Sequence, residues 1–303
     1  MAAVSDMSAS DTPVEVVAIF GPTASGKSAV AECVADRLET EIVSADALQV
    51  YRGIPIVTNQ PTRPTRLVAF RELHEEMSVG EYAALAHPEV DGLVARFGSA
   101  VVCGGTGLYL RAALHDLGIP PPPRAGVRAT IEREVQGDAN AAHARLAALD
   151  PASAARIHPH DHRRVVRALE LAEEGLSLVP ARDALWSAET RRPTLVVGLH
   201  VPAAALEERI RARAARMLGS GAAAEARAAL AGPISRTAEQ ALGLRELATL
   251  PPEDALERLV IRTRRYAAYQ RKWMRRIPGL VQIDATRAGE DVAAEIIQRA
   301  GRE

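Results

Sequence analysis

Apolar residues along the chain follow two alternating patterns. Four continuous apolar runs predict strands buried on both faces of a parallel sheet: 14–20, 41–45, 193–201 and a run that begins at Ser99. Behind the first run, apolar residues recur at steps of three and four, which predicts a helix: Val30, Cys33, Val34 and Leu38. Strands that alternate with helices indicate an α/β fold.

The middle of the chain has a different pattern. The proline run GIPPPPRAG, 118–126, interrupts the alternation and is typical of a boundary. From Val127 to about Ala188 the sequence is alanine-rich and amphipathic, without a strand candidate. We therefore expect a helical insertion domain over 119–192, a core formed by 14–118 and 193–303, and a flexible N-terminus over 1–13.

Bulk composition is that of a globular protein. The chain has 303 residues, of which 48% are hydrophobic, so it can bury a large core without disulfides. Its two cysteines lie in a predicted helix and a predicted strand, so we expect neither a disulfide nor a zinc site. Residues 1–13 lack the apolar run of a signal peptide or membrane helix. We expect a cytoplasmic monomer that binds no membrane.

The basic residues are nearly all arginines. The formal net charge of -1 includes 37 basic residues, and only Lys27 and Lys272 are lysines. Genomic composition is the favoured explanation of this bias. Arginine also makes bidentate contacts to phosphate that lysine does not make, so both interpretations stay open.

A phosphate-binding loop follows the first predicted strand. The sequence GPTASGKS has the form G-x-x-x-x-G-K-[ST] and comprises Gly21, Pro22, Thr23, Ala24, Ser25, Gly26, Lys27 and Ser28. Between a strand and a helix, the backbone N–H groups of such a loop point at an anion, helped by the helix dipole. Lys27 adds a positive charge, and Ser28 can hold Mg²⁺. The alternative is a chance match in a glycine-containing turn.

Two further strand ends carry polar residues. Asp46 follows the second predicted strand, and Thr106 stands in a Gly-Gly-Thr-Gly turn after the third. Ligands of open α/β sheets bind beyond the carboxyl ends of the strands, so both residues should face the crevice of the phosphate loop. A Gly-Gly-Thr-Gly turn alone is equally consistent with an ordinary turn.

Clusters of cations occur in two predicted helices. Arg163, Arg164 and Arg167 lie in the insertion, where a solvated helix face is an equal alternative. The histidines beside them suggest a metal, but Pro159 breaks the segment and no metal-binding spacing is present. After the last predicted strand, one helix face carries Arg209, Arg213 and Arg216, which could clamp a diphosphate, and the core-facing side carries Leu206, Ile210 and Met217.

A strongly basic helix is predicted near the C-terminus. Residues 258–276 hold eight basic residues, arranged on both edges of an apolar arc that includes Tyr266 and Trp273. A nucleic-acid backbone requires such one-sided positive charge, although an ordinary charged amphipathic helix is an alternative.

Three classes of protein fit the phosphate loop. A kinase or GTPase leaves the basic helix unexplained, and a nucleic-acid-binding NTPase without catalysis leaves Asp46 unused. A transferase with a small diphosphate donor and a nucleic-acid acceptor uses every feature.

The motifs resemble, in order, those of the tRNA dimethylallyltransferases, also called tRNA isopentenyltransferases. The segments are GPTASGKS, VSADALQVYRG, GGTGLYL, DHRRVVRALE, RARAARML and TRRYAAYQRKWMRR, and they span about 14–284. The resemblance implies a P-loop NTPase-like core with a helical insertion domain. It implies transfer of the dimethylallyl group of dimethylallyl diphosphate to the exocyclic amine of an adenosine. That adenosine is 3′-adjacent to the anticodon, in tRNAs reading codons that begin with U.

Site residues follow from the same resemblance. The loop Gly21–Ser28 would hold the diphosphate, with Ser28 near Mg²⁺. Asp46 would act as general base, Thr106 would lie beside the reacting centre, and Arg213 would neutralise the leaving group. The tRNA anticodon stem-loop would contact three segments, through Asp46, Ala47, Leu48, Gln49, Arg163, Arg164, Arg167, Gln240, Gly243 and Arg245. The target base would have to flip out of its stack.

The chain departs from the family pattern at two places. It reads YRGIPIVTNQP at Tyr51–Pro61, where the family usually has YRGMDIGTAKP, so a Gly-Thr-Ala-Lys element is missing. It has Leu244 where a tyrosine is usual. The closest alternative is an adenylate isopentenyltransferase, which would give no reason for the arginines of the insertion or for the basic helix. A small-molecule kinase is a more distant alternative.

Overall fold

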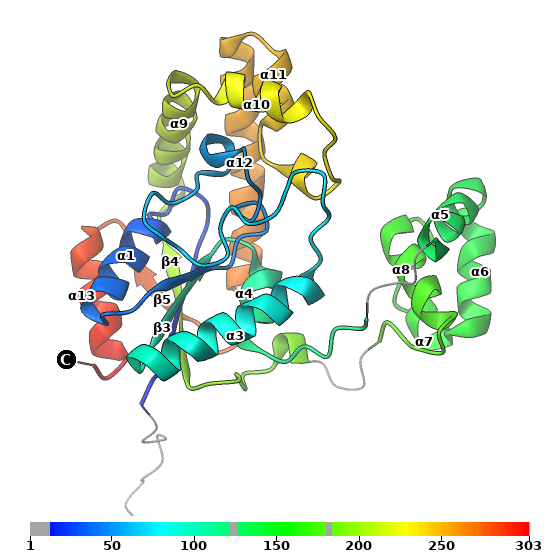
Figure 1. The fold of residues 1–303 in the computed structure, drawn as a ribbon, viewed down its shortest axis with the longest axis horizontal. Coiled ribbons are helices and arrows are strands. Elements are labelled where there is room, and N and C mark those ends of the chain that lie inside the picture. The colour runs from blue at the N-terminus through cyan, green and yellow to red at the C-terminus, as the bar shows by residue number, and fades with distance from the viewer. Residues whose placement is uncertain (1–12, 122–125, 180–183, 303) are drawn as a thin grey trace, which may run out of the picture. The chain divides into compact units, whose positions relative to one another are not determined.

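The computed structural model describes residues 13–121, 126–179 and 184–302, which form two compact units (Figure 1). The larger unit contains the chain up to His115 and from Trp186 onward, and the smaller contains Asp116–Leu185. The predicted N-terminal segment 1–13 lies outside the described residues except for Pro13, as does the middle of the proline run.

The larger unit is built on a parallel sheet. Its described strands have the order β2-β3-β1-β4-β5. Their bounds are β1 Val16–Phe20, β2 Ile42–Ser44, β3 Ala100–Gly104, β4 Thr194–His200 and β5 Val281–Asp284. All five residues of β1 are buried, as expected for a central strand covered on both faces. The prediction of an α/β fold with a parallel sheet is confirmed, and β5 is a strand that the sequence did not predict.

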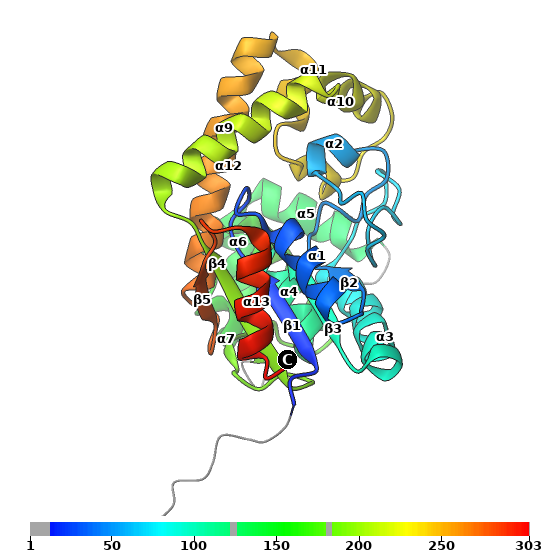
Figure 2. The ribbon, with the colours of Figure 1, turned by 90° about the vertical axis from the view of Figure 1, so that its left-hand side faces the viewer.

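Helices cover both faces of this sheet (Figure 2). On one face, α1 (Lys27–Arg37) packs against α13 (Gly289–Arg299). On the other, α3 (Val79–Phe97) packs against α4 (Gly107–Leu114). This three-layer arrangement leaves the loops at the carboxyl ends of the strands free to form a site.

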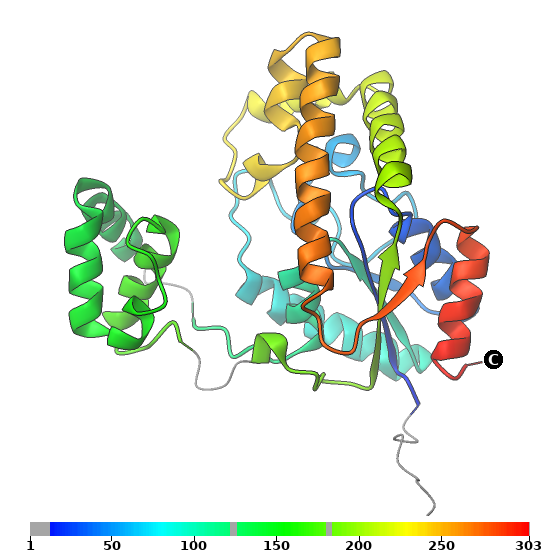
Figure 3. The same cartoon turned by 180° about the vertical axis from the view of Figure 1, so that it is seen from behind.

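Further helices stand beyond those strand ends. Helix α9 (Ala203–Gly219) leaves β4 and packs beside α12 (Pro252–Met274), as Figure 3 shows. The remaining short elements of this region are α2 (Pro55–Thr58), α10 (Ala222–Leu230), η2 (Ala238–Gln240) and α11 (Leu244–Thr249). The α9 residues predicted to face the core, Leu206, Ile210 and Met217, are all buried.

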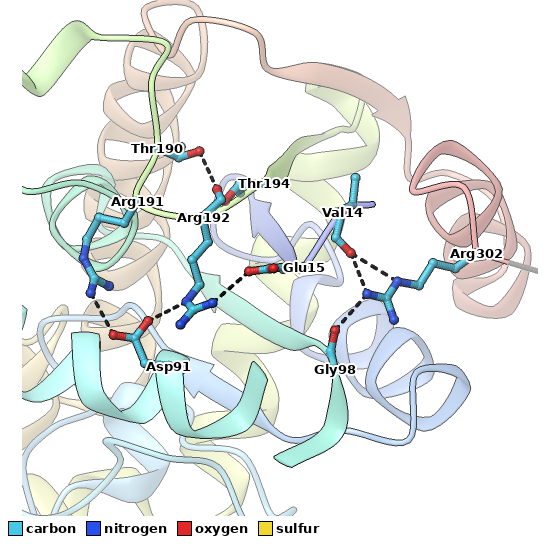
Figure 4. Close-up of polar contacts among 9 residues, drawn as sticks. All are labelled: Val14, Glu15, Asp91, Gly98, Thr190, Arg191, Arg192, Thr194 and Arg302. Carbon is cyan, nitrogen blue, oxygen red and sulfur yellow. Dashed lines mark hydrogen bonds and ion pairs between the residues drawn. The ribbon is translucent and has the colours of Figure 1, made fainter. Parts of the chain in front are cut away.

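The opposite end of the sheet is closed by ion pairs (Figure 4). Asp91 of α3 accepts from Arg191 at 2.8 Å and from Arg192 at 2.6 Å, and Arg192 also pairs with Glu15 at 2.8 Å. Arg302 donates to the carbonyls of Val14 and Gly98. These contacts join both chain ends and the segment before β4 to the base of the sheet.

The segment that leads into β4 is held against α4 by buried polar groups. The Arg111 guanidinium donates to the Ser187 carbonyl at 2.6 Å, and His115 Nδ1 lies 2.6 Å from the Glu189 carbonyl. The predicted insertion ends at 192, whereas the smaller unit ends at Leu185, because these contacts attach the following residues to the core.

The smaller unit is helical. It contains α5 (Val127–Gly137), α6 (Ala139–Leu149), α7 (Pro151–Ala154) and α8 (His162–Ala172), and η1 (Ala184–Trp186) lies at its end. Its own core includes Ile131, Leu146 and Leu169. The unit therefore buries an apolar cluster separate from that of the sheet.

Candidate functional site

The predicted phosphate loop connects the central strand β1 to α1. The Lys27 ammonium donates to the Pro22 carbonyl at 2.9 Å, and the Ser25 N–H donates to the same carbonyl at 3.2 Å. Ser28 lies in the first turn of α1 and is exposed, and its hydroxyl forms no hydrogen bond with any residue that the structure describes. The loop therefore offers a preformed backbone turn, one ammonium group and one available hydroxyl.

A cavity of about 390 Å³ opens in front of this loop. It is lined by Ala24, Gly26, Lys27, Ser28, Ala29, Asn59, Arg209, Ala212, Arg213 and Arg216. The row of arginines predicted on α9 thus faces the phosphate loop across one pocket. Four cations and no acidic side chain line it, which suits a multiply charged anion.

Two of these cations, Lys27 and Arg213, have pKa values below their usual range. Burial lowers the pKa of Lys27, and Cys103 and Asp46 oppose this shift. Burial likewise lowers the pKa of Arg213, with Asp46 opposing and Arg216 adding to the shift. An anion in the cavity would offset the effect of this burial and of the repulsion between the cations, so the pocket favours negative charge.

Arg213 also contacts the loop directly. Its guanidinium donates to the Thr23 hydroxyl at 2.8 Å. Arg209 donates to the Ala285 carbonyl at 3.1 Å. Helix α9 therefore holds its arginines in fixed positions, which reduces the entropy lost when a ligand binds.

Asp46 and Thr106 meet at neighbouring strand ends. The Thr106 hydroxyl accepts from the Ala47 N–H at 3.1 Å, and the Asp46 carboxylate accepts from the Leu48 N–H at 3.0 Å. Both residues are half-buried. The structure therefore brings the acidic residue and the hydroxyl of the Gly-Gly-Thr-Gly turn together, next to the phosphate loop.

Gln270 is a residue of this site that was not singled out from the sequence. It is buried on α12, and its carboxamide oxygen accepts from the Thr23 N–H at 2.7 Å. Its Nε2 donates to the Gly105 carbonyl at 2.8 Å, and a Cβ on Gly105 would lie only 2.4 Å from that nitrogen. One side chain thus joins the phosphate loop to the Gly-Gly-Thr-Gly turn.

Tyr266 stands one turn before Gln270 on the same helix. Burial raises the pKa of its phenol, and the negative charge of Asp46 raises it further, whereas Thr106 opposes the shift. The phenol therefore stays protonated beside Asp46 at neutral pH and can donate a hydrogen bond there.

Comparisons with known proteins identify the family. A family model described as IPP transferase matches residues 49–277, and one described as isopentenyl transferase matches 14–72. The chain belongs to the IPP transferase family.

Individual relatives agree with this assignment. The tRNA dimethylallyltransferase of Anaeromyxobacter dehalogenans strain 2CP-C is 40% identical over 302 residues, which cover 94% of this chain and 100% of the relative. That of Salinispora arenicola strain CNS-205 is 40% identical over 297 residues, which cover 93% of this chain and 85% of the relative. The resemblance inferred from the motifs is confirmed.

Solved structures share the fold. The tRNA isopentenylpyrophosphate transferase of Bacillus halodurans superposes with a TM-score of 0.68 at 29% identity, covering 95% of this chain and 96% of its own. A eukaryotic dimethylallyltransferase acting on tRNA gives a TM-score of 0.78 at 24% identity, covering 96% of this chain and 80% of its own. At this identity the likeness concerns the fold alone.

The predicted tRNA-contacting residues of this IPP transferase fall in three places. Ala47, Leu48 and Gln49 follow Asp46, and the Gln49 carboxamide contacts Ser44 and Asn59. Gln240 is exposed at the end of η2, Gly243 is buried before α11, and Arg245 is exposed and paired with Glu239.

The third place is the smaller unit. Arg163 and Arg164 are exposed in the first turn of α8, and Arg164 pairs with Asp161 at 3.5 Å. Arg167 is half-buried and donates to the Pro121 carbonyl at 2.6 Å and to the buried Glu170 at 3.1 Å. Its contacts within the unit therefore give Arg167 a structural role in addition to any role in binding.

The basic helix α12 differs in part from the predicted wheel. Tyr266 and Trp273 are only half-buried, while Thr263 and Gln270 are buried, because the face toward the phosphate loop is polar. Arg262 and Arg264 form ion pairs with Glu246 and Glu207, and Arg271 donates to the Val201 carbonyl. The cations of 258–276 that are exposed and form no ion pair with a described residue are Arg258, Arg265, Lys272, Arg275 and Arg276, of which Arg276 covers the Trp186 ring.

Other expectations concern metals and membranes. The described residues contain no group of three or more His, Cys, Asp or Glu side chains placed to hold a metal. Cys33 and Cys103, both in the described part, are free thiols. Across the ranges that the structure covers, none of the helices has both the length and the apolarity that a membrane crossing requires.

Proposed function

We propose that this IPP transferase transfers the dimethylallyl group of dimethylallyl diphosphate to the exocyclic amine of the adenosine 3′-adjacent to the anticodon. The acceptors are tRNAs that read codons beginning with U. One observation carries the proposal: a phosphate loop and three arginines of α9 line one cavity, and Asp46 lies close enough to affect the pKa of both Lys27 and Arg213.

The cavity holds the diphosphate as a leaving group. Backbone N–H groups of the loop, Lys27 and Arg213 contact its oxygens and stabilise the negative charge that grows as the allylic C–O bond breaks. The electron pair of that bond leaves with the diphosphate. Arg213 is oriented by its hydrogen bond to Thr23, so no reorganisation is needed when the charge develops.

The adenosine amine forms the new bond. Its lone pair attacks the allylic carbon, a C–N bond replaces the C–O bond, and the amine loses a proton to the Asp46 carboxylate. The Leu48 N–H holds one carboxylate oxygen, which leaves the other to face the amine. Thr106 and Tyr266 place hydroxyl groups near this carboxylate: the Thr106 hydroxyl accepts from the Ala47 N–H, and the negative charge of Asp46 acts on the Tyr266 phenol.

A divalent cation fits this site. Mg²⁺ binds through one or two protein oxygens together with substrate phosphates, and the Ser28 hydroxyl is exposed to the cavity without a protein partner among the described residues. We propose that Ser28 would hold Mg²⁺, and that the ion would supply positive charge to the leaving group. Lys27 and the arginines of α9 stabilise the remaining negative charge of the diphosphate.

Transfer to RNA distinguishes this function from adenylate prenylation. The exposed cations of α12 and α8 are available to phosphates of an RNA, which a free nucleotide would not need. We propose that the enzyme acts as a monomer in the cytoplasm. The test is to offer dimethylallyl diphosphate labelled in its prenyl group to tRNA and to AMP in parallel. Label is expected in tRNA, and label in AMP alone would reject the proposal.

A further inference from the structure

Four aromatic side chains form a continuous row on the larger unit. Tyr266, Tyr269 and Trp273 follow one another on α12, and Trp186 lies beside them at the end of η1. The ring centroids of Tyr266 and Tyr269 are 6.4 Å apart, those of Tyr269 and Trp273 are 6.5 Å apart, and those of Trp273 and Trp186 are 5.0 Å apart. We call these four residues the aromatic row.

The row runs from the reacting centre to the surface. Tyr266 lies beside Thr106 and within the electrostatic influence of Asp46. Tyr269 is 53% exposed, although it is a large aromatic residue of a helix with a well-packed opposite face. Burial of the row in the core would have covered Tyr269, so packing alone does not explain it.

Contacts with Gly107 and Arg276 fix the positions of two rings of the aromatic row. A Cβ on Gly107 would lie 2.5 Å from ring atoms of Trp273, so the Trp273 indole packs directly on the backbone at the start of α4. Trp186 is covered by the guanidinium of Arg276, 3.9 Å from its ring centroid. These contacts hold the rings in place before any ligand arrives.

Cations flank the row. Arg265, Lys272 and Arg275 are exposed, lie within two residues of Tyr266 or Trp273 in the sequence and form no ion pair with a described residue. Flat rings bordered by free cations match the chemistry of an unpaired nucleotide, which offers a π-face and a phosphate at each step. A duplex hides its base faces, and an apolar protein partner would not use the cations.

We propose that the aromatic row is a stacking platform for the unpaired nucleotides next to the target adenosine of the RNA substrate. Tyr269 provides the main exposed face, and Arg265, Lys272 and Arg275 contact the adjoining phosphates. The row would then hold the neighbours of the target base while that base turns toward Asp46. This inference rests on the proposed function, because it requires a single-stranded RNA loop as the acceptor.

The test uses the full chain with a tRNA anticodon stem-loop. Tyr269→Ala removes the exposed ring, and Tyr269→Phe keeps it. The matched control is Ile261→Ala, because Ile261 is 41% exposed on the same helix. Stacking of a base on an aromatic residue contributes about 1–3 kcal/mol, which corresponds to a factor of about 5 to 160 in binding. We expect Tyr269→Ala to raise the KM for RNA by this factor with an unchanged KM for the prenyl donor, and the other two variants to behave as wild type.

A second measurement separates stacking from a general loss of affinity. Stem-loops with abasic nucleotides beside the target should weaken wild-type binding, and Tyr269→Ala should add no further loss with those RNAs. Losses that add, or an unchanged KM for RNA in Tyr269→Ala, would overturn the stacking proposal while transfer to RNA by the wild type stands. Absence of wild-type transfer to any RNA would instead reject the proposed function.

Discussion

The carboxamide oxygen of Gln270 accepts a hydrogen bond of 2.7 Å from the backbone N–H of Thr23, although 247 residues separate them in the chain. The same carboxamide donates to Gly105. A side chain that both accepts and donates is needed here, which explains a glutamine in the buried face of α12. The site thus depends on α12 for its shape as well as for its charge.

Gln270→Met should remove the hydrogen bonds that Gln270 makes to Thr23 and Gly105 without changing the charge of α12. It leaves the Thr23 N–H buried without an acceptor, which costs about 1–3 kcal/mol in the free energy of unfolding. The loop and the Gly-Gly-Thr-Gly turn then lose their connection, so kcat should fall more than tenfold. Urea unfolding and steady-state kinetics measure both effects, with the exposed Gln298→Met as control. An unchanged kcat would show that the connection does not matter to the reaction.

Asp46→Asn should remove the proton acceptor while keeping the size of the side chain. General-base catalysis contributes a factor of about 10² to 10⁴, so kcat should fall by that amount while tRNA binding persists. Single-turnover transfer and a filter-binding measurement report the two quantities. The control is Asp254→Asn, an exposed residue in the first turn of α12. Wild-type turnover in Asp46→Asn would remove this residue from the mechanism.

Arg213→Gln should weaken the hold on the diphosphate. A hydrogen bond to a charged group contributes about 1.5–3 kcal/mol, so kcat/KM for the prenyl donor should fall about 10- to 160-fold. Arg211→Gln is a close control, because Arg211 lies on the same helix, pairs with Glu257 at 2.6 Å and does not line the cavity. Equal effects of the two substitutions on donor kinetics would contradict a specific role for Arg213.

The free cations of α12 should govern the salt dependence of tRNA binding. Replacing Arg258, Arg265, Lys272 and Arg275 with glutamine removes up to four phosphate contacts, each lowering the slope of log affinity against log salt by about 0.7–0.9. Arg287 and Arg299 share the carboxylate of Glu295 and lie outside α12, so their replacement should leave the slope unchanged. If the fourfold variant keeps the wild-type slope, α12 is an ordinary solvated helix.

His115 should make the fold less stable in mild acid. Burial lowers the pKa of its imidazole from 6.5 to about 4, and its Nε2 has no partner among the described residues. The unfolded chain therefore binds the proton more tightly, so stability is complete above pH 6.5 and falls as pH drops toward 4. The shift corresponds to about 3 kcal/mol. Urea unfolding between pH 7.5 and 4.5 should show this slope in the wild type and much less of it in His115→Gln, and equal slopes would contradict it.

Local patterns predicted much of the larger unit. The strand before the phosphate loop, the loop itself and the helix after it are encoded within one short segment, and the arginines of α9 follow the helical period. The strand β5 was not predicted, because its four residues alternate apolar and polar groups over too short a stretch to stand out. The sequence likewise does not predict the role of Gln270, since only the tertiary fold brings this residue to Thr23.

The placement of Tyr266 and Trp273 shows the same limit. A helical wheel assigns both to the apolar arc of α12, yet they are half-buried, because Trp273 meets Gly107 and Trp186 at the edge of the unit rather than a closed apolar core. Periodicity predicts which residues share a face, and the fold decides what that face meets.

The most direct measurement follows the prenyl group itself. Wild-type enzyme is given labelled dimethylallyl diphosphate, Mg²⁺ and a tRNA anticodon stem-loop with either adenosine or guanosine 3′-adjacent to the anticodon, with AMP in a third reaction. The account predicts label in the adenosine stem-loop alone, released as isopentenyladenosine on digestion. Label in AMP, or in both stem-loops equally, would contradict it.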